Sequence, residues 1–298
     1  MTRVPFLAYV ALAASMAVVG AYVGFSKALV AVFPIFVLAW LRFAIAAVAM
    51  VHWLRRPAAE PPLDGRSRRL LFLQSFFGNF LFSIFMLYGM RQSSALAAGV
   101  IMAALPAVVA LLSWLLLGER IGARIGAAIA CAITGIALVA LARDAEGGLA
   151  SGSLAGSALL LAAVTCEALN VVIGTKLTAS LGPKRISALI NLWGLVLVAP
   201  LALWQLVDFS PRYIDGSYWA LLFVYAIAAS VVTVWLWMTG MRHVPAASAG
   251  IFTVFLPVSA AAVGVAFYGE RFTATQIAAF ALALGGVMLA TWPVRRQN

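Results

Sequence analysis

Apolar residues occur in ten long blocks along the chain, and polar residues gather in the short stretches between them. The blocks cover about 5–27, 33–54, 70–90, 95–117, 121–142, 153–178, 186–207, 217–241, 246–268 and 272–293. A helix needs about 20 mostly apolar residues to cross a bilayer, and each block has that length. The blocks are too long and too uniformly apolar for the strands of a membrane barrel. The pattern therefore predicts an all-α integral membrane protein with ten transmembrane helices.

The composition agrees with this class. Of the 298 residues, 65% are hydrophobic and 10% are charged, which is too little charge for a soluble domain of this size. The first block could belong to a signal peptide, but it continues to Lys27 and exceeds the apolar core of such a peptide. We therefore expect it to be the first helix. Cys131 and Cys166 each fall inside a predicted helix, so no disulfide framework and no metal site is expected.

The net charge of +11 is distributed unevenly over the two sides of the membrane. With the N-terminus inside, the cytoplasmic side receives fourteen basic residues: Arg3, Arg55, Arg56, Arg66, Arg68, Arg69, Arg120, Arg124, Lys176, Lys184, Arg185, Arg242, Arg295 and Arg296. The outer side receives five, which are Lys27, Arg91, Arg143, Arg212 and Arg271. This bias predicts that both termini are cytoplasmic. Loops that face anionic lipid account for the basicity, so the lipid bilayer is an expected partner and nucleic acid is not.

The chain also repeats itself at an offset of 151 residues. The segment "GMRQSSALAAGVIMAALP" at 89–106 aligns with "GMRHVPAASAGIFTVFLP" at 240–257. The alignment continues without a gap to Gly135, which meets Gly286. Alanine-rich chains match themselves by chance, but glycine, proline, arginine and glutamate identities in one register do not arise that way.

The tripeptide Gly-Glu-Arg follows the fourth helix of each copy, at 118–120 and at 269–271. Glycine can take the left-handed conformation that ends a helix, and the glutamate then lies near the positive N-terminus of the next helix. A structural turn is the main expectation here, and a gating ion pair is the alternative. Because five helices precede the second copy, it begins on the opposite side of the membrane. We therefore predict two inverted-topology five-helix repeats, 1–148 and 149–298.

Ten helices in two copies, with a proline in the fourth and ninth and Gly-Glu after each, resemble the drug/metabolite transporter superfamily, specifically its EamA-type exporters. The chain looks most similar to the bacterial exporters of aromatic and other hydrophobic amino acids. The resemblance implies a bacterial inner-membrane protein with a central cavity surrounded by helices 1, 3, 4, 6, 8 and 9. It also implies a secondary transporter that exports small zwitterionic metabolites by alternating access. The alternative within the superfamily is a broad-specificity exporter of lipophilic metabolites or drugs.

Polar side chains at mid-membrane depth are expected to face this cavity, because facing lipid is costly. Asn79, Ser83 and Met86 share one face of the third helix. The offset carries Asn79 to Ser230 and Met86 to Trp237 in the eighth helix. The candidate substrate-binding residues are Ser15, Tyr22, Asn79, Ser83, Met86, Met102, Glu167, Asn170, Ser230 and Trp237.

Each candidate also has a structural explanation. Serine hydroxyls often bond to carbonyls of their own helix. Asparagine side chains often join neighbouring helices, at about 0.6–2 kcal/mol each. Methionine and tryptophan side chains fill apolar cores or lie in the interfacial belt.

Glu167 is the acidic residue placed well inside a predicted helix, since the other eight fall in loops or at helix ends. An ionised carboxylate at that depth costs a few kcal/mol or more unless it is paired or hydrated. Glu167 is therefore the candidate for coupling transport to a proton, or for meeting the ammonium of the substrate. The structural alternative is a pair with Arg42 or a hydrogen bond with Asn170.

An enzyme is not expected. His52 and His243 are isolated from other metal-ligand residues, and the acids form no D-x-x-D cluster. The sequence also lacks a G-x-x-x-x-G-K-[ST] phosphate-binding loop, so no ATPase domain is expected in the chain. Neither a cofactor nor a metal is expected, and the remaining partner is the small-molecule substrate.

Overall fold

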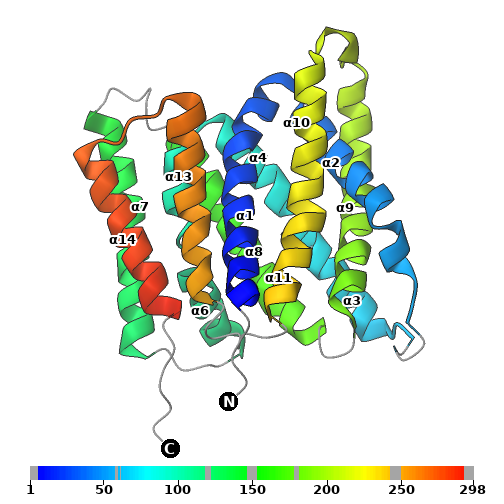
Figure 1. The fold of residues 1–298 in the computed structure, drawn as a ribbon, viewed down its shortest axis with the longest axis horizontal. Helices are drawn as coiled ribbons and strands as arrows, with labels where there is room; N and C mark the ends of the chain where they lie inside the picture. The colour runs from blue at the N-terminus through cyan, green and yellow to red at the C-terminus, as the bar shows by residue number, and fades with distance from the viewer. Residues whose placement is uncertain are drawn as a thin grey trace, which may run out of the picture.

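The computed structural model describes residues 6–57, 60, 62–117, 122–145, 153–177, 181–241 and 250–291. Helices stand side by side in one bundle, and the described residues contain no strand (Figure 1). This confirms the all-helical class.

The first half of the chain contains α1 (Phe6–Val32), α2 (Ile35–Ala49), η1 (Val51–Leu54), α3 (Gly65–Ser75), η2 (Phe76–Leu81), α4 (Phe82–Arg91), α5 (Ala95–Met102), α6 (Leu105–Leu117) and α7 (Ala123–Ala145). The second half contains α8 (Leu154–Leu177), α9 (Pro183–Leu206), η3 (Pro211–Tyr213), α10 (Gly216–Ile227), η4 (Ala228–Val232), α11 (Thr233–Met241), η5 (Gly250–Val254), α13 (Phe255–Tyr268) and α14 (Ala274–Thr291).

Four helical segments of the described chain are long and apolar enough to cross a membrane: Phe6–Val32, Gly65–Arg91, Lys184–Leu206 and Gly216–Trp237. The other predicted spans hold shorter apolar helical stretches of 10–17 residues, some of them parts of longer helices, such as Ala123–Leu138 in α7 and Leu154–Asn170 in α8. A multi-pass membrane protein is therefore confirmed, while the full number of ten crossings stays a prediction. Two boundaries differ clearly from the expected blocks, because α1 continues to Val32 instead of ending near 27, and α3 begins already at Gly65 instead of near 70. The Asp64 side chain caps this helix by accepting a hydrogen bond from the Ser67 N–H at 2.9 Å.

The two prolines of the repeat interrupt their helices at equivalent places. Ala103 and Ala104 separate α5 from α6, and Pro106 is the second residue of α6. In the second half, the 3-10 helix η5 precedes α13, and Pro257 is the third residue of α13. A proline has no N–H to donate and is tolerated in the first turn of a helix, so each proline begins a new helical segment.

Among the described residues, each half contains one π-helical segment, in which backbone hydrogen bonds join residues five apart instead of four. The first is η2 (Phe76–Leu81), between α3 and α4, and the second is η4 (Ala228–Val232), between α10 and α11. The offset of 151 carries residues 77–81 onto 228–232, so the same irregularity occurs twice at one position of the repeat. Such segments frequently occur at functional sites.

The halves of the chain interlock. Figure 1 shows α7 and α14 side by side at one end of the bundle and α2 and α9 near the other, with α1 and α8 between them. Helix α1 packs against α13 and α11 of the second half, and α8 packs against α4, α5 and α6 of the first half. The main apolar core, which includes the fully buried Phe43 and Met86, therefore draws on both halves.

Two glycines bring α7 and α14 into close contact. A Cβ on Gly135 would lie 3.2 Å from the carbonyl oxygen of Ala279, and a Cβ on Gly286 would lie 3.2 Å from that of Ala128. The offset of 151 relates Gly135 to Gly286 and Ala128 to Ala279. In each helix the glycine therefore contacts the alanine of the other helix that lies seven residues earlier in the repeat. This reciprocal pattern means that α7 and α14 run antiparallel.

Candidate functional site

A buried arginine lies in the interior of the bundle. Arg42 is in the middle of α2 and is 6% exposed. Its Nη2 donates to the Ser83 hydroxyl of α4 at 3.2 Å, and its guanidinium carbon lies 4.5 Å from the ring centre of Phe43. The guanidinium also lies 6.0 Å from the ring centre of Tyr225 in α10, within reach of the tyrosine hydroxyl. Arg42 therefore points into the bundle and meets side chains of two other helices.

Glu167 brings an acidic side chain to the same region. It lies in the middle of α8, is partly buried, and accepts a hydrogen bond at 3.4 Å from Nδ2 of Asn170, one turn along the helix. Its carboxylate interacts electrostatically with Arg42 and with Tyr22 of α1. Within the described residues, no ion pair of 4 Å or less joins Glu167 to Arg42.

Two tyrosines lie next to the charged residues. The rings of Tyr22 and Tyr225 meet edge to face, with 5.6 Å between their centres and an angle of 83°. Together, α1, α2, α4, α8 and α10 assemble a group of six side chains that we call the central polar cluster: Tyr22, Arg42, Ser83, Glu167, Asn170 and Tyr225. The cluster offers one positive group, one negative group and two aromatic faces.

The π-helical segment η2 packs against this cluster through Gly78, which contacts Asn170. A Cβ on Gly78 would lie 2.6 Å from Cβ of Asn170, which is closer than real atoms approach. Only a glycine at this position leaves room for the Asn170 side chain, which in turn bonds Glu167. The irregular backbone of η2 and the absence of a side chain at Gly78 thus set the position of the acidic half of the cluster.

Four of the ten predicted site residues belong to the central polar cluster, namely Tyr22, Ser83, Glu167 and Asn170. Met86 and Met102 are buried in the surrounding apolar core. Their assignment to substrate binding, like that of the cluster residues, stays a prediction.

The other predicted residues lie elsewhere or bond between helices. The Ser15 hydroxyl donates to the carbonyl of Thr233 at 2.9 Å, and Asn79 donates to the carbonyl of Ile190 at 2.7 Å. Trp237 packs against Ala8 and Leu12, near the beginning of α1. Ser230 is partly buried in η4.

Arg42 and Tyr225 were missed by the sequence reasoning. The resemblance placed the second helix outside the ring around the cavity, so Arg42 was considered only as a structural partner of Glu167. A signal was available, because a lone arginine in the middle of an apolar span is a candidate functional residue. Tyr225 carried no such signal, since tyrosine is common in membrane helices.

A second charged contact lies at one end of the bundle. The Lys27 ammonium of α1 meets Oε1 of Glu270 at 2.7 Å, and the backbone N–H of Ala95 donates to the same oxygen at 3.0 Å. Gly269 takes a left-handed conformation with φ of 63°, as expected of the glycine in this corner. Glu270 also forms an ion pair, which was the alternative expectation, and a gating role for that pair stays a prediction. The matching corner at 118–120 lies outside the described residues. Glu270 therefore joins α1, α5 and the α13–α14 corner.

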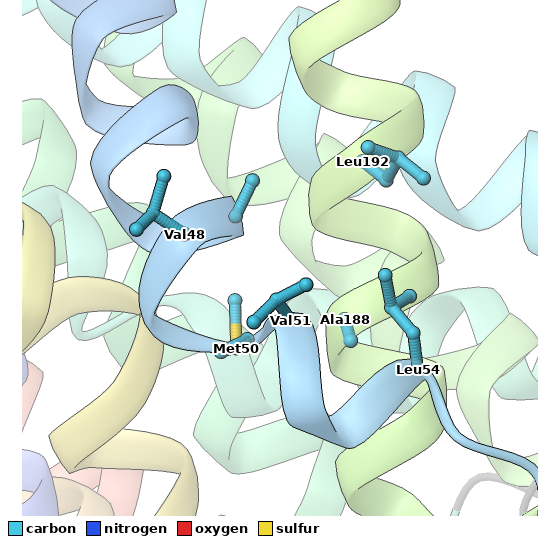
Figure 2. A pocket seen from close by; sticks show the side chains of 7 residues that line it. Val48, Met50, Val51, Leu54, Ala188 and Leu192 are labelled. Atoms are coloured by element: carbon cyan, nitrogen blue, oxygen red, sulfur yellow. The ribbon is translucent and has the colours of Figure 1, made fainter.

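An apolar pocket opens on the outside of the bundle (Figure 2). It has a volume of about 260 Å³ and is lined by Ala47, Val48, Met50, Val51, Leu54, Ala188 and Leu192. Val48 is 77% exposed and Val51 is 61% exposed, so this surface lies on the outer side of α2 and η1. The lining offers no charged or polar side chain, and the pocket is separate from the central polar cluster.

Comparison with known protein families finds one family, and its model matches each half of the chain. The EamA-like transporter family matches residues 6–141 and again residues 154–292. The chain is 32% identical over 286 residues to the uncharacterized transporter YetK of Bacillus subtilis (strain 168), covering 95% of this chain and 86% of that protein. A solved crystal structure of a protein superimposes with a TM-score of 0.65 over 98% of both chains at 18% identity, which shows a shared fold.

Proposed function

Since the chain belongs to the EamA-like transporter family, we propose that it is a secondary transporter that exports small zwitterionic metabolites, chiefly aromatic and other hydrophobic amino acids. The family assignment covers both halves and gives the general activity, which is transport of a small molecule across a membrane. The substrate class, the direction and the mechanism are the proposal.

The central polar cluster is the observation that carries the substrate class. Glu167 and Arg42 are opposite charges in the middle of apolar helices, where an ion is costly unless it is paired or hydrated. In the described residues they are not joined by a close ion pair. A zwitterion can meet both groups at once, with its ammonium at the carboxylate and its acidic group at the guanidinium. Tyr22 and Tyr225 then supply aromatic faces for an apolar side chain.

The repeat supports alternating access. The reciprocal contact of Gly135 with Ala279 and of Gly286 with Ala128 is what two inverted-topology halves, 1–148 and 149–298, would make around a twofold axis in the membrane plane. The helices interrupted before Pro106 and Pro257 give each half a place where a helix can bend. Transporters of this kind bind substrate near the midplane, which is the depth of Glu167 and Arg42 in their helices.

The orientation rests on charge. The arginine bias supports cytoplasmic termini in a bacterial inner membrane. Figure 1 shows the beginning of α1 and the end of α14 on the same side of the bundle, as an even number of crossings requires. Outward movement of substrate follows from the resemblance to exporters.

The test is counterflow in sealed proteoliposomes that contain the purified full chain. Vesicles preloaded with phenylalanine should accumulate labelled phenylalanine, tryptophan and leucine, and empty vesicles without protein should not. Movement of lipophilic cations or nucleotide-sugars without any amino acid would overturn the substrate class in favour of a broad-specificity exporter. Chemical conversion of the solute would overturn the transporter assignment in favour of a membrane enzyme.

A further inference from the structure

We propose that Arg42 is the residue that binds the carboxylate of the substrate, so that the ligand must carry an acidic group beside its amine. The inference rests on the proposed function and deepens it, because it states which chemical group decides recognition. It assigns a role in specificity to α2, which the family resemblance placed outside the ring of helices around the cavity.

The hydrogen bonds of Arg42 are incomplete. Its Nε is buried and has no hydrogen-bond partner. The Tyr225 hydroxyl lies within reach of the guanidinium. Nη2 reaches the Ser83 hydroxyl at 3.2 Å, which is longer than the 2.7–2.9 Å typical of a charge-assisted bond to an anion. A guanidinium carries five N–H donors in a rigid fork that matches the two oxygens of a carboxylate. At least the Nε–H donor of Arg42 therefore has no hydrogen-bond acceptor within the protein.

The charge of Arg42 is also uncompensated at close range. Among the described residues, the close ion pairs are Lys27 with Glu270 and Arg185 with Glu60, and Arg42 takes part in neither. Glu167 interacts with Arg42 electrostatically, but its carboxylate bonds with Asn170 on its own helix. A buried charge without a close partner destabilises the protein. An anion that arrives with the substrate would remove this cost in the bound state.

The surroundings of Arg42 fit the carboxylate of a hydrophobic amino acid better than a bare anion. Phe43 lies against the guanidinium, with its ring centre 4.5 Å away, and the edge-to-face pair of Tyr22 and Tyr225 is adjacent. Glu167 supplies the opposite charge for the ammonium. Chloride could occupy the same fork, since it is also a monoanion, and the experiment below distinguishes the two sources of negative charge.

Binding to the detergent-purified full chain tests the proposal with three ligands. Phenylalanine carries both charged groups, phenylalaninamide keeps the ammonium without the carboxylate, and 3-phenylpropionate keeps the carboxylate without the ammonium. Wild type should prefer phenylalanine to phenylalaninamide by about tenfold or more, as expected for a charged hydrogen-bonded pair. Arg42→Gln should lose this preference, because its affinity for phenylalanine should fall while its affinity for phenylalaninamide stays unchanged. The preference of Arg42→Lys should lie between those of wild type and Arg42→Gln, because an ammonium keeps the charge but lacks the paired N–H donors of the guanidinium.

The matched control is Arg212→Gln, which removes an exposed arginine that lies over the ring of Tyr213 outside the bundle core. It should leave all three affinities as in wild type. The ratio of two affinities in one sample does not depend on how much of the variant is folded. A structural role for Arg42 would lower both affinities equally, and that result would overturn the proposal.

The outcomes also separate this inference from the proposed function. If 3-phenylpropionate binds in an Arg42-dependent way and phenylalanine binds no better, carboxylate recognition stands and the zwitterion substrate fails. If Arg42→Gln retains the preference for phenylalanine over its amide, the inference fails and the substrate class stands. If chloride alone raises the melting temperature through Arg42 and no carboxylate ligand does, the fork is an inorganic anion site and the inference is wrong.

Discussion

The environment of Glu167 is set by its position in the middle of α8 and by Asn170 on the same helix. Asn170 donates to its Oε1 at 3.4 Å, a long bond that orients the carboxyl group. The carboxyl group is thus held in the middle of an apolar helix, where we propose that it meets a cation.

Glu167→Gln tests this role at the residue scale. Glutamine keeps the size of the side chain and can still accept from Asn170, so the variant should insert and melt like wild type. Counterflow of phenylalanine should fall by about tenfold or more, because the ammonium loses a charged partner. Asp208→Asn, which removes an exposed carboxylate beyond the end of α9, is the control and should transport normally. Wild-type counterflow in Glu167→Gln would reduce Glu167 to a structural residue.

Gly78 acts on the same carboxylate indirectly. In Gly78→Ala the new methyl group would overlap with Asn170, since a Cβ at this position would lie 2.6 Å from Cβ of that residue. Overpacking of this kind destabilises by about 1–3 kcal/mol, so thermal melting in detergent should shift downward, and phenylalanine affinity should fall as Asn170 moves. Gly285→Ala in α14 is the control, because a Cβ on Gly285 would meet no atom within 4 Å. Equal melting temperatures for the two variants would contradict the tight contact.

The elements begin where the local sequence directs them to begin. Asp215 starts α10 by accepting a hydrogen bond from the Ser217 N–H at 2.8 Å, and Asp64 starts α3 in the same way. Hydrogen bonds from the side chain and backbone of Ser217 hold the pKa of Asp215 below its usual range. The starts of α3 and α10 are therefore set by side chains within one turn, whereas α2 and α9 begin without a hydrogen bond from a capping side chain.

This cap predicts a pH-dependent difference in stability. Because the folded-state pKa of Asp215 is depressed, its stabilisation is present above the unfolded value of about 3.9 and is lost as the pH falls through the folded value. Asp215→Ala should therefore melt below wild type at neutral pH, and the two should converge in acid. Asp215→Asn should cap α10 at every pH, because its amide oxygen accepts the same bond. A difference between wild type and Asp215→Ala that persists unchanged in acid would contradict the assignment.

At the scale of the whole molecule, the antiparallel contact of α7 with α14 predicts the side on which each corner lies. The residues before α7 and before α14 should be exposed on opposite faces of the membrane. Single cysteines from Gly122→Cys and Arg271→Cys, each in a chain with Cys131→Ala and Cys166→Ala, test this with an impermeant maleimide on intact cells. One position should react from outside, and the other only after permeabilisation. Reaction of both from the same face would contradict the inverted repeat.

The sequence by itself determined the features that depend on single helices. The length of the apolar blocks indicated the membrane class, the repeat offset located equivalent positions, and Pro106, Pro257 and Gly269 marked the places where helices restart or end. Glu167 was also recognisable, since a carboxylate in the middle of an apolar block is costly whatever its neighbours are.

Only the tertiary structure decided which polar side chains meet. Arg42, Ser83, Glu167 and Tyr225 come from four helices, and no spacing along the chain relates them. In a soluble protein the apolar stripe of a helix would indicate its inward face. In a membrane, lipid and protein core are both apolar, so the pattern does not distinguish the two faces. Asn79 and Asn170 therefore looked equivalent in sequence, yet one bonds the backbone of α9 and the other holds the carboxylate of the cluster.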